Sequence, residues 1–203
     1  MNKPRKWFGP SRKEVWRQLS DELGADYVPG SFKRSDRVEA AHGEWTVVLD
    51  THTVSTGKVT VVYTRVRAPY VNPDGFRFAI YRRGLFSAVG KFLGMQDVEI
   101  GDPPFDDAFI IKGTDESRLR ALFASPRLRE LILQQPEVHL SVKDDEGWFG
   151  PDFPDGVDVL TFMVHGVIKD VDRLKSVYDL FAETLDELCR IGSAYETGPG
   201  LKL

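Results

Sequence analysis

Three carboxylates gather in one short stretch of the chain, residues 100–113, which reads I-G-D-P-P-F-D-D-A-F-I-I-K-G. Carboxylate oxygens are the ligands that hard divalent cations prefer, so Asp102, Asp106 and Asp107 could bind a metal ion. Carboxylates also suit turns and helix starts, where they accept hydrogen bonds from backbone N–H groups. The spacing matches neither an EF-hand loop nor another common metal-binding motif. We therefore interpret this Asp-rich segment as turn and cap chemistry, and we predict no metal site.

The Asp-rich segment is expected to form a turn followed by a short strand. Asp102 and the two prolines after it predict the turn, and residues 105–112 predict the strand. Neighbouring side chains of a strand point to opposite faces, so Asp106 and Asp107 could not easily serve one ion. We take the segment instead as a candidate face for a protein partner. This face is made of Asp102, Phe105, Asp106, Phe109 and Lys112.

Acid–base or nucleophilic chemistry could be assembled from residues farther apart. Asp50 and His52 lie two positions apart and would share one face of a strand, where Ser141 or Cys189 could join them. The chain has no G-x-S-x-G elbow and no cysteine-protease pattern around Cys189. Cys189 also falls near the end of an expected helix, where the helix dipole disfavours a thiolate. We predict no catalytic residues, and our interpretation leans away from an enzyme.

Cofactor and metal signals are equally weak. His139 and His165 fall in two strands that could be neighbours, but no H-x-H or H-E-x-x-H spacing supports a metal site. With Cys189 as the one cysteine, a structural zinc site would need histidine and carboxylate ligands. The glycines form neither G-x-G-x-x-G nor a phosphate loop. We therefore predict no cofactor.

A basic and apolar stretch over residues 82–93 has the pattern of a short membrane-surface helix. Its apolar residues recur at helical spacing, and basic residues flank them. The alternative, which we favour, is a helix that covers a sheet and has solvated charges at its ends. The candidate membrane patch consists of Arg82, Arg83, Leu85, Phe86, Lys91 and Phe92.

Aromatic residues spread along the chain could line a pocket for a small apolar ligand. Such a pocket would lie between the sheet and the long helix expected over residues 170–190. A filled core is the alternative that we favour, because protein interiors are normally close-packed. The aromatic residues concerned are Trp45, Tyr63, Phe76, Phe78, Phe162 and Phe181.

Composition predicts a soluble globular protein. The 203 residues carry a net charge of −4, which disfavours nucleic-acid binding because a basic domain would be expected there. No apolar run approaches the ~20 residues of a membrane-spanning helix. The basic residues 1–10 are not followed by the apolar core of a signal peptide. We expect a cytoplasmic protein.

Two helices have clear start and stop signals. Ser11 and Glu14 predict a capping box, and Gly24 predicts the end of the first helix. Asp170 predicts the start of the longest helix, which has an apolar stripe along one face and stops at Gly192. Between these two helices, we expect shorter ones over residues 84–94, after a Thr114 cap and after a Ser125–Pro126 cap.

The strands are expected in two meanders with short turns. Alternating apolar residues mark most of them, and His42–Gly43 predicts a tight hairpin between the first two. Ala68–Pro69 predicts a break after the third strand. The expected strands are 37–41, 44–51, 58–67, 76–80, 105–112, 138–142, 148–149 and 157–168.

This order predicts an α+β fold. Mainly antiparallel sheets from the two meanders would be packed by the N-terminal, central and long C-terminal helices. We expect a single domain over residues 11–191, in which sub-lobes 11–100 and 101–191 could be distinguished. Residues 1–10 and 192–203 are expected to be loose ends.

The Asp-rich segment fits the pattern G-D-x-x-F-D-x-x-F-x-I-K-G. With the pieces A-L-F-A-S-P-R-L-R-E-L-I and V-K-D-D-E-G-W-F-G and the closing helix, it resembles an uncharacterised bacterial family, a domain of unknown function. It is also similar to a larger family of unknown function with an F-x-x-x-F strand, a pair of short helices, a meander and a final helix. The resemblance spans residues 76–188 and implies no activity and no catalytic residues.

Three function hypotheses follow. The first is a non-catalytic cytoplasmic domain that binds a protein partner or forms a homo-oligomer, because the pattern is regular and no catalytic motif stands out. The second is a module that binds a small apolar ligand between the sheet and the C-terminal helix. The third is a metal-dependent hydrolase that uses Asp50, His52 or the Asp-rich segment. We favour the first.

Overall fold

The fold is one antiparallel sheet with helices packed against it. The computed structural model describes residues 9–32, 35–55, 57–84, 96–144, 153–200 and 203. The strands are β1 (Asp26–Val28), β2 (Arg37–His42), β3 (Trp45–Ser55), β4 (Thr60–Val71), β5 (Phe78–Arg82), β6 (Gln96–Asp97), β7 (Phe109–Gly113), β8 (His139–Lys143) and β9 (Val157–His165). The helices are α1 (Arg12–Leu23), α2 (Pro103–Ala108), α3 (Glu116–Leu122), α4 (Pro126–Leu133) and α5 (Val171–Arg190).

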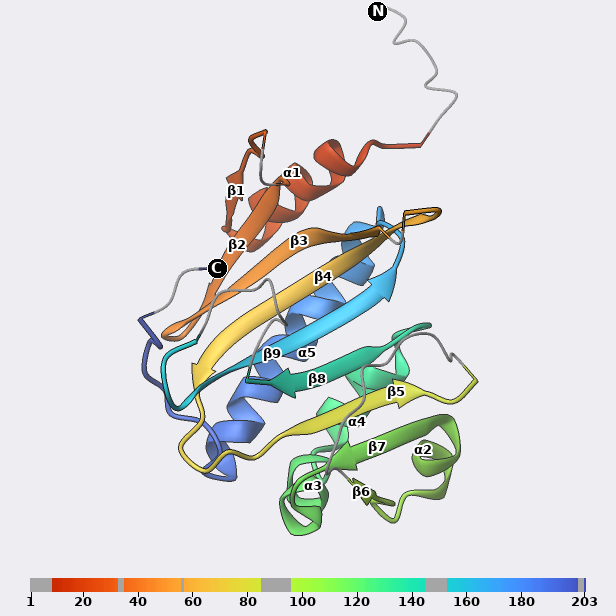
Figure 1. Cartoon of the computed structure of the whole chain (residues 1–203), viewed down its shortest axis with the longest axis vertical. Helices are drawn as coiled ribbons and strands as arrows, with labels where there is room; N and C mark the ends of the chain where they lie inside the picture. The colour runs from red at the N-terminus through yellow and green to blue at the C-terminus, as the bar shows by residue number, and fades with distance from the viewer. Residues whose placement is uncertain (1–8, 33–34, 56, 85–95, 145–152, 201–202) are drawn as a thin grey trace, which may run out of the picture.

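The described strands pair in the order β1-β2-β3-β4-β9-β8-β5-β7-β6 (Figure 1). Every pair of neighbouring strands is antiparallel. The predicted α+β class with a mainly antiparallel sheet is therefore confirmed. The two predicted meanders join into this one sheet, because β4 of the first pairs along its length with β9 of the second.

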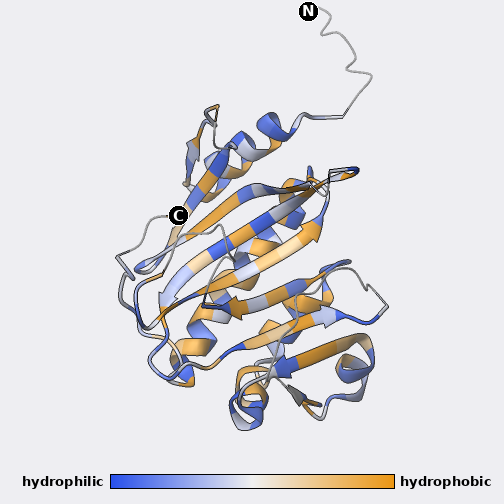
Figure 2. Ribbon diagram, in the orientation of Figure 1, coloured by the Kyte–Doolittle hydropathy of each residue, from blue (hydrophilic) through white to orange (hydrophobic). Residues whose placement is uncertain are grey.

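The longer helices all lie against one face of the sheet. Helices α1, α3 and α4 each contact α5, and α5 runs behind the strands in Figure 1. We call the face that they cover the inner face; it carries buried apolar residues such as Leu49, Val66 and Phe162. The opposite face, which we call the outer face, carries Asp50 and the arginines that bind it. Along β4, hydrophilic and hydrophobic residues alternate, whereas β7 is mostly hydrophobic (Figure 2).

Both predicted long-helix signals are confirmed. The Ser11 hydroxyl and the Glu14 carboxylate form the capping box at the start of α1, and Gly24 ends the helix in a left-handed conformation. At the start of α5, the Asp170 side chain accepts a hydrogen bond from the Arg173 N–H, and Gly192 follows the helix. The apolar stripe of α5 is buried against the sheet, as its spacing predicts.

Strand β4 is longer than its sequence predicts. Pro69 was expected to break the strand after Arg67, but β4 continues to Val71. Pairing of β4 with β3 runs only from Thr60 to Arg67, whereas pairing with β9 runs on to Val71. Pro69 therefore lies where β4 has β9 as its partner on one side alone, a place where a missing N–H is tolerated.

Strand β5 does not join the first meander, contrary to the expected order. It crosses to the far half of the sheet and pairs with β7 and β8. Residues 78–81 are buried on both faces, rather than half-buried as the alternation of Phe76, Phe78 and Ile80 suggests. Aliphatic and aromatic residues on both faces are typical of a central strand, and β5 lies between β7 and β8.

The Asp-rich segment was predicted wrongly as a strand over residues 105–112. Residues 103–108 form helix α2, and strand β7 begins only at Phe109. The Asp102 side chain caps α2 and Pro103 occupies its first turn, a combination that favours a helix start. The predicted Thr114 cap is also wrong, because Asp115 caps α3. The Ser125–Pro126 cap of α4 is confirmed.

The chain after α5 is docked at residues 193–195, although residues 192–203 were expected to be loose. Ser193 and Ala194 are buried, and Tyr195 forms an isolated bridge with Val71. The Ser193 hydroxyl lies 2.8 Å from Arg118 Nη1 and donates to Asp74 at 2.9 Å. These contacts tie the segment after α5 to the start of α3 and to the loop after β4.

Several predicted features lie outside the described residues. They are the loose residues 1–8, most of the helix expected over 84–94, and the strand expected at 148–149. Among the helices that the structure describes, none combines the length and the apolar character needed to cross a membrane.

A buried glycine at the end of β7 generates a stability prediction. A Cβ atom at Gly113 would lie 2.5 Å from Cδ1 of Leu119, which is fully buried. We expect Gly113→Ala to lower the free energy of unfolding by about 1–3 kcal/mol, because Leu119 has no space into which it can move. Urea unfolding would measure the change.

Gly9→Ala is the matched control, because nothing lies within 4 Å of the added methyl group. Combining Gly113→Ala with Leu119→Ala should cost less than the sum of the two single changes, since the shortened side chain makes room. Strict additivity, or an unchanged stability of Gly113→Ala, would contradict the close approach.

Candidate functional site

The carboxylates of the Asp-rich segment are engaged in holding its own backbone. The Asp106 carboxylate accepts hydrogen bonds from the backbone N–H groups of Ile100 at 2.9 Å, Gly101 at 3.0 Å and Asp102 at 3.1 Å. Asp102 caps α2 and forms an ion pair with Arg129 at 3.2 Å. The interpretation of Asp106 as an acceptor for nearby N–H groups is confirmed. These two carboxylates are therefore structural.

The five residues of the candidate partner face do not form one surface. Phe105 and Phe109 are only 1% exposed, and their ring centroids lie 4.7 Å apart inside the core. Lys112 pairs with Asp97 at 2.9 Å on the outer face. A partner could therefore not reach the two aromatic residues of the predicted face.

A polar cleft of about 440 Å³ lies beside this segment, between β6, β7 and α3. Its walls carry the negatively charged residues Asp97, Glu99 and Glu116 and the positively charged residues Arg83 and Arg120. Glu116 is bound by Arg120 at 2.8 Å. In the part of the chain that the structure describes, no three His, Cys, Asp or Glu side chains gather as a metal site would require.

The two described arginines of the candidate membrane patch make contacts inside the protein. The Arg82 guanidinium lies 4.8 Å from the centroid of the Phe109 ring, and its Nη2 donates to the Gln135 carbonyl at 3.0 Å. Arg83 Nε donates to the Asp106 carbonyl at 3.2 Å. The other members, Leu85, Phe86, Lys91 and Phe92, lie outside the described residues.

Asp50 and His52 share the outer face of β3, as their spacing predicts, but the possible nucleophiles Ser141 and Cys189 do not join them. Asp50 in β3 and Ser141 in β8 are separated by β4 and β9, or about 14 Å at the usual strand spacing. Cys189 is on α5, which covers the inner face. Burial, followed by the charges of Glu196 and Asp186, raises the pKa of the Cys189 thiol. A thiol with a raised pKa is a poor nucleophile.

The two histidines that were weighed as a possible metal pair, His139 and His165, have different surroundings. Burial, with a smaller effect of Lys143, lowers the pKa of His139 to about 4. His165 is exposed at the end of β9, and its ring meets Tyr63 edge-on at a centroid distance of 5.9 Å. His139 is therefore neutral near pH 7, while His165 faces solvent.

A cluster of charges on the outer face was not predicted from the sequence. Arg65 binds both Asp50 oxygens, at 2.8 and 2.7 Å, and Arg67 binds Asp50 Oδ2 at 2.8 Å. Burial by itself would raise the pKa of Asp50, but the hydrogen bonds and charges of the two arginines outweigh it and hold this pKa below its ordinary value. The cluster therefore carries one net positive charge in a largely buried position.

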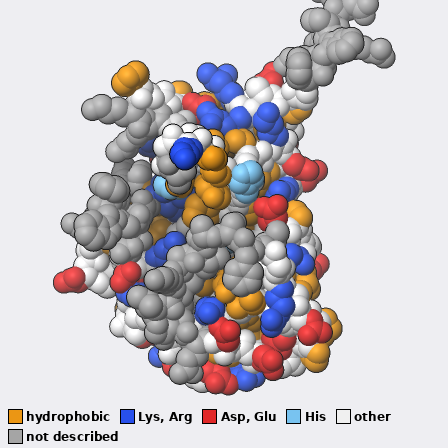
Figure 3. Space-filling view, turned by 45° about the vertical axis from the view of Figure 1, so that its right-hand side comes forward, with side chains coloured by type: hydrophobic (Ala, Val, Ile, Leu, Met, Phe, Trp, Pro, Cys, Tyr) orange, Lys and Arg blue, Asp and Glu red, His pale blue; other side chains and the backbone are white. Residues whose placement is uncertain are grey.

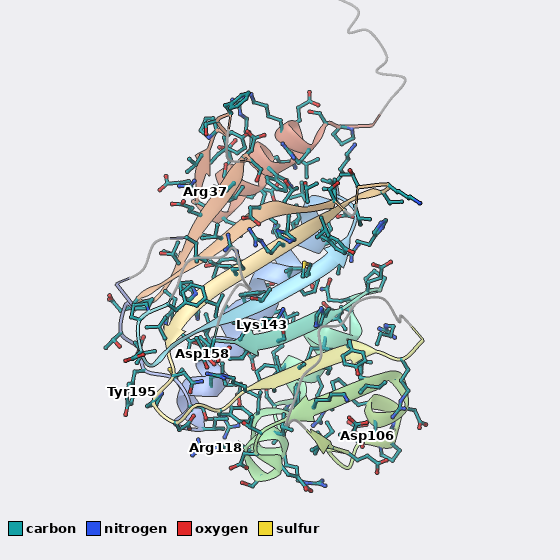
Figure 4. The ribbon with its side chains drawn as sticks, viewed as in Figure 1. Arg37, Asp106, Arg118, Lys143, Asp158 and Tyr195 are labelled. Carbon is teal, nitrogen blue, oxygen red and sulfur yellow. The ribbon has the colours of Figure 1, made fainter. Side chains whose placement is uncertain are left out.

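The strand register extends this cluster into a positive surface. The outer face of β2, β3, β4, β9 and β8 carries Arg37, Arg65, Arg67 and Lys143, against the carboxylates of Glu39 and Asp50. Figure 4 shows Arg37 on β2 and Lys143 on β8, at the two sides of this surface. The excess of two positive charges contrasts with the net charge of −4 of the whole chain.

An open group of aromatic, apolar and histidine side chains lies at the hairpin end of the same surface. Val54 is 40% exposed, His165 is exposed, and the other members are half-buried. Figure 3 shows hydrophobic side chains gathered on one face of the molecule, with histidine and Lys or Arg side chains around them. We call this group the outer-face patch: His52, Val54, Val61, Tyr63, Met163 and His165.

A second buried polar network, also missed from the sequence, lies at the opposite end of β4 and β9 on the inner face. The Asp158 carboxylate accepts from Arg77 Nε at 3.0 Å and from Asn72 Nδ2 at 2.6 Å. Burial and the charge of Asp158 raise the pKa of Tyr70 well above its ordinary value. Figure 4 places Asp158 near Arg118 and Tyr195, where the chain after α5 is docked. This network therefore has a structural role.

Comparison with known proteins shows the fold alone. No known sequence family matches the chain, and no curated protein matches it. The crystal structure of the mycobacterial trehalose monomycolate transport factor A, TtfA, is similar to it with a TM-score of 0.56 and 11% sequence identity. The similarity covers 89% of this chain and 95% of TtfA. The arrangement of one sheet with helices on one side is thus shared with a solved protein.

The depressed pKa of His139 predicts acid sensitivity. Its pKa of about 4 in the folded protein lies below the ordinary value of 6.5, so its contribution to stability is complete above pH 6.5 and declines as the pH falls toward 4. We expect the free energy of unfolding to fall by about 3 kcal/mol from this group between pH 7 and pH 4. Denaturant unfolding at several pH values would measure the decline.

His139→Gln should remove this part of the pH dependence, whereas His165→Gln, which alters an exposed histidine, should keep it. Equal slopes for the two variants would show that His139 titrates at its ordinary pKa in the folded protein.

Neighbouring aspartates in the Asp-rich segment allow a matched comparison. Asp106→Asn should lower the free energy of unfolding by about 1–3 kcal/mol, because an amide cannot accept all three backbone N–H groups. The exposed Asp107→Asn makes the same chemical change and should stay within about 0.5 kcal/mol of the unchanged protein. Thermal or urea unfolding gives both values, and equal losses would contradict the structural role of Asp106.

Proposed function

We propose that this chain is a non-catalytic cytoplasmic domain that binds a protein partner through the outer-face patch. The observation that carries the proposal is the asymmetry of the sheet. The longer helices cover the inner face, while the hairpin end of the outer face presents aromatic, apolar and histidine side chains to solvent. Aromatic residues and methionine are enriched in protein interfaces, and Tyr63 and Met163 are of these types.

The state of the reactive groups supports binding rather than catalysis. Asp50 is bound by two arginines, Asp102 and Asp106 cap backbone groups, and the pKa of the Cys189 thiol is raised. A catalytic site needs several such groups within hydrogen-bond reach of one reacting atom. Asp50, Asp102 and Asp106 are thus already bound by neighbouring groups, and Cys189 lies on the helix that covers the inner face, away from Asp50.

The structural neighbour is compatible with this proposal. TtfA is described as a transport factor for trehalose monomycolate. A fold can serve unrelated functions, so the shared fold does not name a partner for this chain.

The apolar-ligand alternative has weaker support. The seam between the sheet, α1 and α5 contains a cavity of about 20 Å³, lined by residues such as Leu49, Val66 and Leu174. This volume suits about one water molecule, whereas ligand sites usually have 300–1,000 Å³. A small apolar ligand would therefore need the seam to widen before it could bind.

Site-specific photo-crosslinking in cells tests the proposal. A photoreactive benzoylphenylalanine placed at Tyr63 should give one discrete cross-linked protein, because Tyr63 lies in the outer-face patch. The same group placed at the exposed Asp179 of α5, on the opposite side of the molecule, should not give that product. Mass spectrometry of the product would identify the partner.

Two further results make this experiment decisive. Excess unmodified protein should abolish the product, and excess Met163→Asp protein should not, since a buried carboxylate in the interface opposes binding. The proposal fails if both positions yield the same products, or if Tyr63 yields none.

A further inference from the structure

We infer that the segment bound by the outer-face patch is acidic and carries an apolar anchor residue. This inference rests on the proposed function and names the chemistry of the partner. It is argued from the charges that surround the patch, the side chains within it, and the alternatives that these features disfavour.

The first argument is the charge of the Arg65–Asp50–Arg67 cluster beside the patch. Two guanidinium groups share one carboxylate, and the side chains are 17%, 11% and 7% exposed in that order. Arg65 lies opposite Met163 in the register of β4 and β9, so its charge borders the patch directly. A partly desolvated positive charge attracts an anion more strongly than a fully solvated one.

The second argument is the wider field of the surface. Lys143 on β8 adds a positive charge to the same face, while Arg37 on β2 forms an ion pair with Glu39, so the outer face from β2 to β8 keeps an excess of two positive charges. Complementary charge steers a partner to its site and selects against partners of like charge. A partner with carboxylates at its rim would therefore meet an excess of opposite charge on this surface.

The third argument is the composition of the patch itself. Tyr63 and the histidines His52 and His165 present broad rings with polar tips, and Met163 presents an apolar thioether. The edge-on contact of Tyr63 with His165 holds two of these rings in a defined arrangement. An apolar side chain of the partner can pack against these rings, while neighbouring carboxylates reach toward Arg65.

The same features disfavour two other occupants. A second copy of this chain would place positive surface against positive surface if the two outer faces met, which costs free energy. Nucleic acid would meet a chain of net charge −4, whereas nucleic-acid-binding domains are usually basic overall. An anionic lipid surface has the same sign of charge as an acidic peptide, so the experiment below tests binding to each of them separately.

Fluorescence anisotropy with designed peptides tests the inference on the full chain. The probe is a labelled twelve-residue peptide of Glu and Asp with one Trp and two Leu, and its control replaces every acidic residue by Lys. We expect the acidic peptide to bind and the basic peptide not to bind. Raising the salt from 50 to 300 mM should weaken the binding roughly tenfold, because partly exposed charges are screened.

Charge-reversed variants locate the binding. Combining Arg37→Glu with Lys143→Glu should weaken binding of the acidic peptide at least roughly tenfold, since both changes make the outer face less positive. Arg127→Glu reverses one charge on α4, on the inner side, and should leave the affinity unchanged. Circular dichroism confirms that each variant is folded, and Met163→Asp provides a second test of the anchor contact.

The possible outcomes separate the two proposals. Equal binding of both peptides, or no binding of the acidic one, overturns the acidic-segment inference. Binding to phosphatidylglycerol vesicles in the absence of peptide binding also overturns it, in favour of a lipid surface. If Tyr63 still cross-links a discrete partner in either case, the proposed function stands while the inference fails.

Discussion

The pairing of β4 with β9 is the interaction on which the rest of the structure depends. It runs from Thr64 opposite Val164 to Val71 opposite Val157 and joins the N-terminal meander to the strands of the C-terminal half. Both polar networks of the sheet are anchored on these two strands: Arg65 and Arg67 extend from the outer face of β4, and Asp158 lies on the inner face of β9. A register shift of one residue would exchange these faces and bury the arginines among the helices.

Helix α5 is the second constraint, because its apolar stripe fixes which face of the sheet is covered. The sequence alone predicts this helix well: Asp170, the spacing of Leu174, Val177 and Phe181, and Gly192 are all local signals. The capping box of α1 is predicted for the same reason. Features that depend on a few neighbouring residues can be derived from spacing, since each of their hydrogen bonds closes within the same segment.

The features that the sequence does not reveal depend on distant partners. Residues 105–112 alternate like a strand, but the Asp102 cap and the contacts of Asp106 with Ile100 and Gly101 make their first half a helix. The crossing of β5 to the far half of the sheet has no local signal. The Arg65–Asp50–Arg67 cluster needs the β3–β4 register, although the alternation of Tyr63, Arg65 and Arg67 with Thr64 and Val66 could have indicated one polar face of β4.

The Arg65–Asp50–Arg67 cluster is costly for a structure that needs only stability. Moving charged groups out of water is unfavourable, and buried ion pairs can often be replaced by apolar residues of similar volume without loss of stability. On the inner face, Leu49 and Val66 fill the positions next to Asp50 and Arg65 with apolar side chains, so the same strands can be packed without charge. The outer face instead retains two arginines on one carboxylate beside a group of open aromatic and apolar side chains. A surface of this kind supports recognition, because it combines a fixed positive charge with an apolar area that a partner can cover.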